Sequence, residues 1–455
     1  MNTPEKTAPA NGNGDPRLWP VATVMATGIF ATTFVQLQGL GYLPFNHLLT
    51  SMGLDSDKSA TFFSLSMLPW TFKVIAGLFV DGVPLFGSRR RAYLLLSALI
   101  ASAMWLWMGW APSNYNLLLI LAIGMNTAIV FGSTTSGGLL VEAGQRFNAS
   151  GRLSSLRVFA QNLGAGLGLP VGGLLATHAL GWTSTAALLP LLCMFVAAWF
   201  LLREPPLPPA VEHGRSFVEQ RLHVIASIWR QIKNVMRWQM LLPALLLFFI
   251  QAVPTFRSTC FYQYQTKTLH YSDAALGWLG LAGYGVALLS SGVYALWCRK
   301  ASLRTSLYGA IFVTSLSALP YLFYTAYEPY MLRAITIEGV GTFLQYLAYL
   351  PLFDLAVRCT PKGSEALGYS LLISVWNIGL MIGSKIGPTI YEHTLLAAMR
   401  IPQWFDPAIN FTKVSAAIHR QEMNHLIWLN AGVTLAGVAI VFLLPKALVD
   451  KREGK

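Results

Sequence analysis

One carboxylate and three consecutive arginines stand close together near the start of the chain. Asp81 closes the apolar stretch LPWTFKVIAGLFVD, and Arg89, Arg90 and Arg91 follow after the short segment GVPLFGS. A carboxylate at a helix end can pair with arginines, or with a neighbouring helix end, in one conformation and release them in another. The pattern predicts a conformational gate centred on Asp81. Alternatively, the three arginines are there only because the cytoplasmic loops of membrane proteins are rich in basic residues.

Four ionisable residues lie deeper within apolar runs: Lys73, Arg257, Glu338 and Lys385. Charges inside a membrane are costly and mark functional sites by default. Glu338 is the only carboxylate that we expect at the depth needed to carry a proton. The three bases outnumber it, so a cavity lined by them should prefer anions. Alternatively, Glu338 forms a structural pair with Arg257 or Lys385, because a pair costs less in lipid than either charge alone.

Aromatic and amide side chains in the apolar runs could bind the uncharged part of a solute. Trp70 and Trp376 could stack a planar ring, and Gln36 and Gln251 could hydrogen-bond it. Such residues also serve helix packing in membranes. We therefore expect these four residues to be either substrate contacts or packing contacts.

The elements that position these residues are membrane helices. Of the 455 residues, 54% are hydrophobic and only 11% are charged, whereas soluble domains carry about 25% charged residues. Apolar runs long enough to cross a hydrocarbon core of about 30 Å occur at 21–48, 59–83, 91–111, 115–141, 154–178, 182–202, 240–269, 273–297, 304–325, 330–357, 365–391 and 425–446. The chain is predicted to be an all-α membrane protein with about twelve transmembrane helices.

An internal repeat relates the two halves of the chain. A constant, gap-free shift superposes Gln36 on Gln251, and it carries the ladder Gly164, Gly168 and Gly172 onto Gly379, Gly383 and Gly387. A parallel repeat of two pseudo-symmetric six-helix bundles is the pattern of the major facilitator fold. Both ladders place small residues on one helix face. We expect them to be packing surfaces between the halves, and not phosphate loops.

The positive charge is distributed unequally between the two sides of the membrane. The formal net charge is +13, and most of the 32 Lys and Arg residues fall in the tails and in alternate loops. On the opposite side lie only Lys58, Lys267, Arg400, Lys413 and Arg420. Since basic residues concentrate on the cytoplasmic side, both termini should be cytoplasmic and the polar segment 392–424 should be outside.

The domain boundaries follow from these runs. We expect a disordered cytoplasmic tail at 1–20, an N-terminal bundle at 21–202 and a cytoplasmic linker with a surface helix at 203–239. A C-terminal bundle at 240–446 and a short cytoplasmic tail at 447–455 follow.

Three stretches resemble one family within the major facilitator superfamily. PWTFK at 69–73, DGVPLFGSRRRAYLLLS at 81–97 and RCTPKGSEALGYSLLISVWNIG at 358–379 are similar to the folate–biopterin transporter family. The resemblance implies proton-linked movement of a pterin-like or other anionic organic solute. Two positions depart from the family pattern: Gly137 stands in place of an acid, and Arg257 lies where acids follow Pro254-Thr255. Muropeptide and siderophore permeases share a Lys before the Asp-to-Arg loop and remain alternatives.

Other classes of protein find little support. The four Cys and eight His are dispersed, and neither HExxH nor GxSxG occurs, so we expect no metal, cofactor or catalytic residue. The positive charge belongs to loops, so nucleic acid is not expected as a partner. The sequence predicts a monomeric, multi-pass transporter of a bacterial inner membrane, whose partners are a small anionic solute, a proton and lipid. A receptor derived from a transporter is a further alternative.

Overall fold

The protein is almost entirely helical. The structure is a computed structural model that describes residues 16–54, 56–111, 113–204, 229–265, 269–271, 273–326, 331–398, 416–450 and 452–453. Within these ranges the only β pairing is an isolated bridge between Leu85 and Ser88, and there is no strand. The predicted tail 1–20, linker 203–239 and outer segment 392–424 lie partly or largely outside the described residues.

The chain divides into two compact units. Unit 1 comprises Met1–Arg237, Val357–Leu371 and Arg452–Lys455, and unit 2 comprises Trp238–Ala356 and Leu372–Lys451. The segment Val357–Leu371 joins two helices of the second half of the chain, yet it packs with the first half. This segment and the C-terminal end therefore belong to unit 1.

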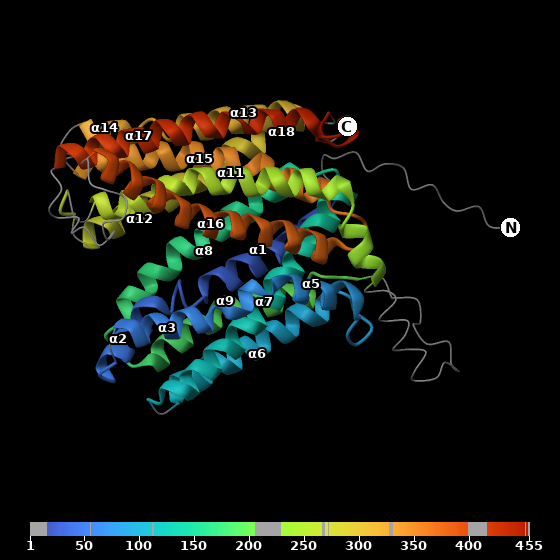
Figure 1. Ribbon diagram of the computed structural model, residues 1–455. Coiled ribbons are helices and arrows are strands. Elements are labelled where there is room, and N and C mark those ends of the chain that lie inside the picture. The colour runs from blue at the N-terminus through green and yellow to red at the C-terminus, as the bar shows by residue number, and fades with distance from the viewer. Residues whose placement is uncertain are drawn as a thin grey trace. The chain divides into compact units, whose positions relative to one another are not determined.

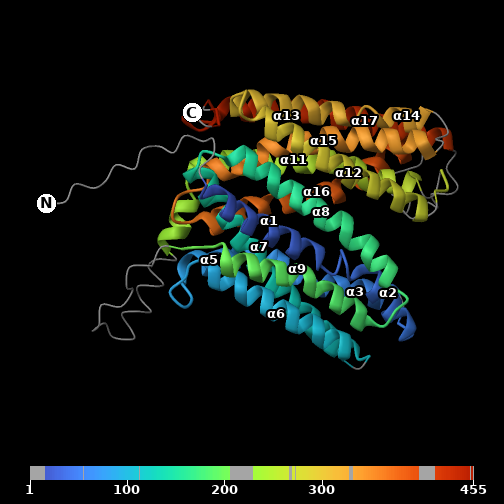
Figure 2. The same ribbon diagram turned by 180° about the vertical axis from the view of Figure 1, so that it is seen from behind.

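Unit 1 is built from the first nine helices and the short segments that pack on them. The helices are α1 (Leu18–Phe34), α2 (Tyr42–Ser51), α3 (Ser56–Ser66), α4 (Leu68–Thr71), α5 (Lys73–Gly82), α6 (Arg91–Trp110), α7 (Tyr115–Arg146), α8 (Ser150–Leu175) and α9 (Leu180–Phe200). Helix α6 packs along α7 and α9 (Figure 1). Helix α1 lies beside α7, α8 and α9, and Figure 2 shows it next to α8.

Four of the expected spans contain a break in the helix: 21–48, 59–83, 304–325 and 425–446. The run 21–48 divides into α1 and α2 at a turn that contains Gly39 and Gly41, where the N–H of Leu40 bonds back to Phe34. The run 59–83 divides into α3, α4 and α5. Pro69 lacks the N–H that would continue the helical hydrogen bonds from α3, which accounts for the first break.

The glycine ladders allow close helix contact inside each unit, and not between the halves as expected. A Cβ on Gly164 of α8 would lie 2.8 Å from the carbonyl oxygen of Phe30 in α1. A Cβ on Gly379 of α16 would lie 2.7 Å from the carbonyl oxygen of Phe248 in α11. Only glycine fits at such distances. Each ladder therefore faces the first helix of its own unit.

Unit 2 contains the remaining helices from α11 onward. They are α11 (Trp238–Gln263), α12 (Asp273–Trp297), α13 (Leu303–Ser317), α14 (Tyr321–Ala326), α15 (Met331–Cys359), α16 (Glu365–Ala398), α17 (Ala416–Leu435), α18 (Gly437–Leu443) and α19 (Lys446–Val449). The C-terminal end of α15 and the start of α16 belong to unit 1. Helix α17 packs on α11, α13 and α14. It begins at Ala416, so residues 416–424 of the predicted outer segment are helical.

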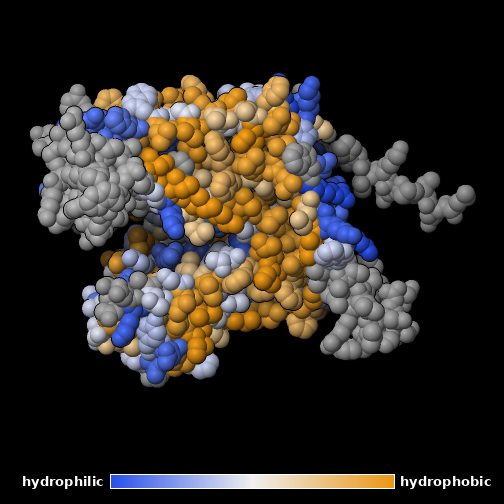
Figure 3. Space-filling model, viewed as in Figure 1, coloured by the Kyte–Doolittle hydropathy of each residue, from blue (hydrophilic) through white to orange (hydrophobic). Residues whose placement is uncertain are grey.

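Many helices are long and apolar enough to cross a membrane. Within the described residues nine meet this condition, or ten if the bent pair Trp229–Val235 and Gln239–Thr255 forms one span. Large apolar side chains point outward from them, among them Leu241 and Leu245 of α11 and Leu289 of α12. Figure 3 shows the resulting apolar surface over α11. An apolar exterior of this kind is suited to lipid and not to water.

Candidate functional site

A buried ion cluster forms around Asp81 at the end of α5. Its Oδ1 atom lies 2.8 Å from Nη1 of Arg90 and 3.5 Å from Nη2 of Arg89. Its Oδ2 atom accepts a hydrogen bond of 2.7 Å from the backbone N–H of Leu367. Leu367 lies in the first turn of α16, where free N–H groups and the helix dipole favour an anion. Asp81 thus contacts arginines and a helix end at once.

Glu365 is the second carboxylate of this cluster. Its Oε2 atom lies 3.0 Å from Nη2 of Arg89 and 3.3 Å from Nη2 of Arg90. Its Oε1 atom accepts a hydrogen bond from the N–H of Gly363 at 2.7 Å. The side chains of Asp81 and Arg90 are 0% and 2% exposed. Two arginines and two carboxylates therefore neutralise one another, with only Arg89 partly exposed, and they hold the segment 357–371 on the rest of unit 1. We call these four residues the Asp81 cluster.

Glycines allow the segment 357–371 to approach so closely. A Cβ on Gly77 of α5 would lie 2.8 Å from the Cα atom of Leu367, and one on Gly138 of α7 would lie 3.1 Å from the Cβ atom of Ala366. At Gly137 a Cβ would lie 2.9 Å from the ring of Tyr369. The family pattern has an acid in place of Gly137, and here the tyrosine ring fills that space. The departure noted in the sequence is thus a packing contact.

Arg91 has different surroundings from the other two arginines. Its Nη2 atom donates to the carbonyl oxygen of Trp199 at 2.9 Å, and its guanidinium lies 4.9 Å from the centroid of the Trp199 ring. The structure does not bring Arg91 to Asp81. Arg89 and Arg90 are therefore the arginines that could act in a gate.

Sequence reasoning missed Glu204, which follows α9. Its carboxylate accepts hydrogen bonds from the backbone N–H groups of Arg89, Arg90 and Arg91 at 2.6, 2.7 and 2.7 Å. It also accepts one from Ser88 Oγ at 3.0 Å. These N–H groups form the start of α6, which needs partners for its free donors. Glu204 thus fixes the backbone from which the arginines project.

Lys73 is buried in unit 1, where its direct contacts are neutral and the cation of Arg157 acts on it electrostatically. Its Nζ atom donates to Ser133 Oγ at 2.8 Å and lies 5.2 Å from the centroid of the Trp70 ring. The indole N–H of Trp70 donates in turn to Asn126 Oδ1 at 3.0 Å. Among the described residues no carboxylate pairs with Lys73. The break between α4 and α5 places the ammonium and the indole ring together.

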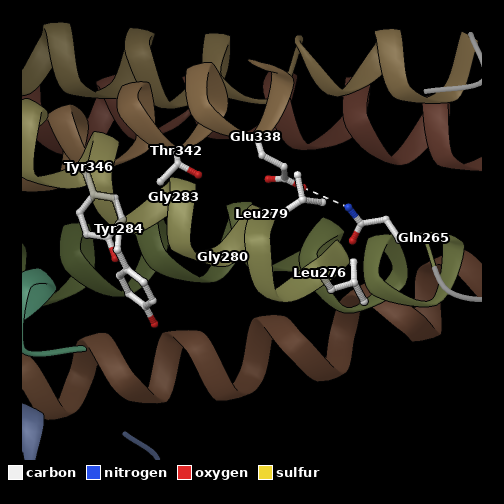
Figure 4. A pocket seen from close by; sticks show the side chains of 9 residues that line it. All are labelled: Gln265, Leu276, Leu279, Gly280, Gly283, Tyr284, Glu338, Thr342 and Tyr346. Atoms are coloured by element: carbon white, nitrogen blue, oxygen red, sulfur yellow. Dashed lines mark hydrogen bonds between the residues drawn. The ribbon is translucent and has the colours of Figure 1, made fainter. Parts of the chain in front are cut away.

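Glu338 of α15 lines a cavity of about 450 Å³ in unit 2 (Figure 4). Its Oε1 atom accepts from Gln265 Nε2 at 3.1 Å, and its Oε2 atom accepts from the hydroxyl of Tyr321 at 2.7 Å. The structure does not bring Lys385 to Glu338, and the Lys385 side chain is exposed. The Arg257 side chain lies outside the described part of the structure. The groups described around Glu338 are neutral donors.

The remaining predicted contacts differ in their surroundings. Trp376 is buried, with the Tyr349 ring edge-on at 4.5 Å and the Phe353 ring at 5.2 Å. Gln251 is buried in α11, and its Oε1 atom has no hydrogen-bond partner among the described residues. Gln36 is half-buried in the turn between α1 and α2. Of these three, Trp376 is the one most fully engaged in packing.

Comparison with solved structures defines the class of protein. The chain is similar to the proton:xylose symporter XylE of the major facilitator superfamily, bound to 6-bromo-6-deoxy-D-glucose, with a TM-score of 0.62 and 13% identity. The match covers 97% of this chain and 98% of that chain. The fold is therefore the all-helical major facilitator fold, as the sequence predicted. The protein is an integral, multi-pass membrane protein.

The family follows from the sequence comparisons. The model of the BT1 family matches residues 38–455, so the chain belongs to the BT1 family. A similar relative is the folate-biopterin transporter of Synechocystis sp., 28% identical over 79% of this chain and 73% of the relative. Another is folate transporter 1 of Plasmodium falciparum, 25% identical over 70% of this chain and 62% of that one. These are transporters, which confirms the expected family and the expectation of a transporter.

Proposed function

We propose that this protein moves an anionic organic solute of the folate or pterin class across the membrane. The observation that carries the proposal is the buried ammonium of Lys73, which has neutral partners in Ser133 and the Trp70 ring. A buried charge is costly unless an opposite charge accompanies it. An anionic solute would supply that charge, and the Trp70 ring could stack on a planar group. The names of the two relatives, which refer to folate and biopterin, agree with this solute class.

The transport cycle is proposed to be alternating access, gated by the Asp81 cluster. The segment 357–371 is held by Asp81 through the N–H of Leu367 and by Arg89 and Arg90 through Glu365. This segment connects α15 to α16. Breaking and remaking its contacts would let these helices move with respect to unit 1. The gate would consist of Asp81, Arg89, Arg90 and Glu365.

Glu338 is the proposed proton-binding residue. It is a half-buried carboxylate in an apolar helix and lines a cavity, and an ionisable group in that setting marks proton or substrate pathways. Its neutral partners, Gln265 and Tyr321, can hydrogen-bond it in either protonation state. Proton uptake would therefore not require the loss of a salt bridge to the described residues. Coupling to a proton gradient would follow if solute binding brings the proton to Glu338.

The remaining parts of the proposal concern the setting of the protein. The one-sided distribution of Lys and Arg supports cytoplasmic termini, and a bacterial inner membrane is proposed as the location. The functional unit is proposed to be one chain with two six-helix bundles, 21–202 and 240–446. Arg257, Lys385, Gln36, Gln251 and Trp376 remain candidate solute contacts.

Counterflow in proteoliposomes tests the proposed function. Purified protein would be reconstituted into liposomes preloaded with unlabelled folate or pterin, and entry of the labelled compound would be followed with and without a pH gradient. We expect counterflow without a gradient and accumulation with an inward proton gradient. If the protein catalyses counterflow of a muropeptide or a siderophore but not of folate or pterin, the proposed solute class is wrong and that compound takes its place. Binding without any counterflow would indicate a receptor.

A further inference from the structure

The cavity in unit 2 is formed by two matching stripes of side chains. On α15, Glu338, Thr342 and Tyr346 follow one another at one-turn spacing. On α12, the lining residues are Leu276, Leu279, Gly280, Gly283 and Tyr284, which recur at the spacing of one helix face. Such spacing puts side chains of one stripe on one side of a helix. The cavity of about 450 Å³ is of the size that small molecules occupy.

The two ends of this cavity differ in chemistry. Figure 4 shows Glu338 and Gln265 at one end, and the rings of Tyr284 and Tyr346 beside each other at the other. Glycines form part of the wall between them. A Cβ on Gly280 would meet no atom within 4 Å, and one on Gly283 would meet only Thr342, at 3.7 Å. The cavity therefore offers an open, partly aromatic space that leads to a carboxylate.

The Glu338 carboxylate is fixed in position but retains the capacity to bind further groups. Gln265 and Tyr321 each donate one hydrogen bond, one to each oxygen. Gln265 Nε2 also lies 3.5 Å from the hydroxyl of Tyr324, and the Tyr321 ring packs edge-on against Phe261 at 5.0 Å. A carboxylate can accept about four hydrogen bonds. Both oxygens thus keep acceptor sites for a ligand in the cavity.

We propose that this cavity binds the amino-substituted, nitrogen-containing aromatic ring of the solute, and that Glu338 takes up a proton as the ring binds. The inference rests on the proposed function and names the part of the solute that unit 2 recognises. The ring would lie near Tyr284 and Tyr346, with its edge toward Glu338. The solute carboxylate is not part of this site, because the described lining contains no base.

The proton follows from the pattern of donors and acceptors along the ring edge. An amino group beside a ring nitrogen that carries no hydrogen presents one donor next to one acceptor. In pterin this edge is formed by the 2-amino group and N1, and it is the edge that we place against Glu338; the edge with N3–H presents two donors and would suit an ionised carboxylate. An ionised carboxylate has acceptors only, whereas a protonated carboxyl group has one O–H donor and one acceptor. The neutral ring edge and the carboxyl group therefore form two parallel bonds, N–H to oxygen and O–H to ring nitrogen. One proton from solvent binds to Glu338 as each ring binds, and the ring itself is chemically unchanged.

A glutamine at position 338 separates ring recognition from proton uptake. The amide of Glu338→Gln has one donor and one acceptor on the same face, so it should bind the ring without a proton. Glu338→Leu removes both groups. The probe is pterin, the bare ring without a carboxylate, titrated calorimetrically into purified full-length protein in two buffers of different ionisation enthalpy. This pair of buffers gives the number of protons taken up per ring bound.

The expected results differ for the three proteins. Wild type should take up about one proton per ring bound. Glu338→Gln should bind the ring with an affinity within a few-fold of wild type and take up no proton. Glu338→Leu should bind the ring at least about tenfold more weakly than wild type. Equal proton uptake by wild type and Glu338→Gln would overturn the role of Glu338. Unchanged pterin binding by Glu338→Leu would overturn the site.

A steric variant tests the cavity without changing any charge. Gly280→Leu would fill open space in the lining, and Gly285→Leu adds the same group at an exposed position of α12 outside the lining. Both variants should show the thermal unfolding of wild type. Gly280→Leu should lose pterin binding and folate counterflow, and Gly285→Leu should keep both. If wild type carries folate and Gly280→Leu carries it equally well, the ring site is refuted while the transport function stands. If wild type carries no folate, the function itself fails.

Discussion

The carboxylate of Asp81 accepts a hydrogen bond from the backbone N–H of Leu367 at 2.7 Å. The two residues lie far apart in the sequence, in the first and second halves of the chain. Asp81 thereby occupies the N-terminal turn of α16 while it pairs with Arg90. This contact is the physical basis of the proposed gate, because it ties a junction between two helices to the body of unit 1.

Replacement of Asp81 by Asn tests that gate. The variant keeps a side-chain oxygen for the N–H of Leu367 but loses the negative charge that balances Arg90. Removing one partner of a buried ion pair costs about 3–5 kcal/mol. We expect Asp81→Asn to insert into the membrane and to bind solute. It should exchange solute more slowly in counterflow, because the Asp81 cluster no longer re-forms fully in each transport cycle.

Arg91→Gln is the matched control for this gate. Arg91 is the neighbouring arginine, but it contacts the Trp199 carbonyl and ring and not the Asp81 cluster. Its counterflow should stay close to that of wild type. Counterflow of Asp81→Asn at the wild-type rate would show that the cluster is a structural ion network without a role in gating.

Glu204→Ala should destabilise the start of α6. The variant would leave three backbone N–H groups, those of Arg89, Arg90 and Arg91, without their carboxylate acceptor. Loss of a helix-capping side chain typically costs about 1 kcal/mol, so the unfolding temperature in detergent should fall by several degrees. Glu142→Gln is the control, because Glu142 is half-exposed and 3.9 Å from Arg90. An equal effect of the two variants would argue against the capping role.

The sequence predicted the ion pair between Asp81 and the arginines, but not the other residues that contact these arginines. A carboxylate followed by arginines at a helix end indicated an ion pair, and the structure contains it. Glu365 and Glu204 were not recognised as partners, because each lies more than a hundred residues from the arginines. Only the folded chain shows such contacts. The helical periods of α12 and α15 do place the cavity residues on one face, and this signal was present in the sequence.

The surroundings of Glu338 and the helix breaks were harder to predict. A pair between Glu338 and a base was one of two alternatives that the sequence left open. The described partners of Glu338 are Gln265 and Tyr321, and the Arg257 side chain lies outside the described residues. Neutral donors such as these cannot be distinguished from packing residues by type alone. Similarly, an apolar run such as 21–48 has the composition of one span, and its break depends on the local turn around Gly39 and Gly41.

Glu453 is expected to hold the C-terminal end on unit 1. Its buried carboxylate lies 2.6 Å from Arg152 Nε and accepts from the Arg152 N–H at 3.2 Å. Glu453→Ala would remove the anion from the first turn of α8. We therefore expect faster trypsin cleavage after Arg452 in the purified protein, measured by mass spectrometry. Asp450→Ala is the comparison, because it breaks a more exposed pair with Arg304. Unchanged cleavage in Glu453→Ala would contradict the contact.

The sidedness of the chain can be tested by thiol labelling. The concentration of basic residues in the tails and in alternate loops predicts cytoplasmic termini and an outer segment at 392–424. Single cysteines would be introduced at positions 5 and 410 in a variant without native cysteines. An impermeant reagent should label position 410 in intact cells and position 5 only after the membrane is opened. The reverse pattern would refute the orientation.

Lys73→Ala tests the anionic nature of the solute. The ammonium is buried beside Ser133 and Trp70 without an acidic partner among the described residues. If it binds the solute carboxylate, its removal should weaken folate binding by about 1–3 kcal/mol, or roughly 5- to 150-fold. Calorimetry on purified protein would measure this loss.

Two controls accompany Lys73→Ala. Binding of pterin, which has no carboxylate, should change little. Ser133→Ala controls for the lost hydrogen bond and should have a smaller effect. Undiminished folate binding by Lys73→Ala would mean that the lysine serves packing, and the anionic solute class would lose its main structural support.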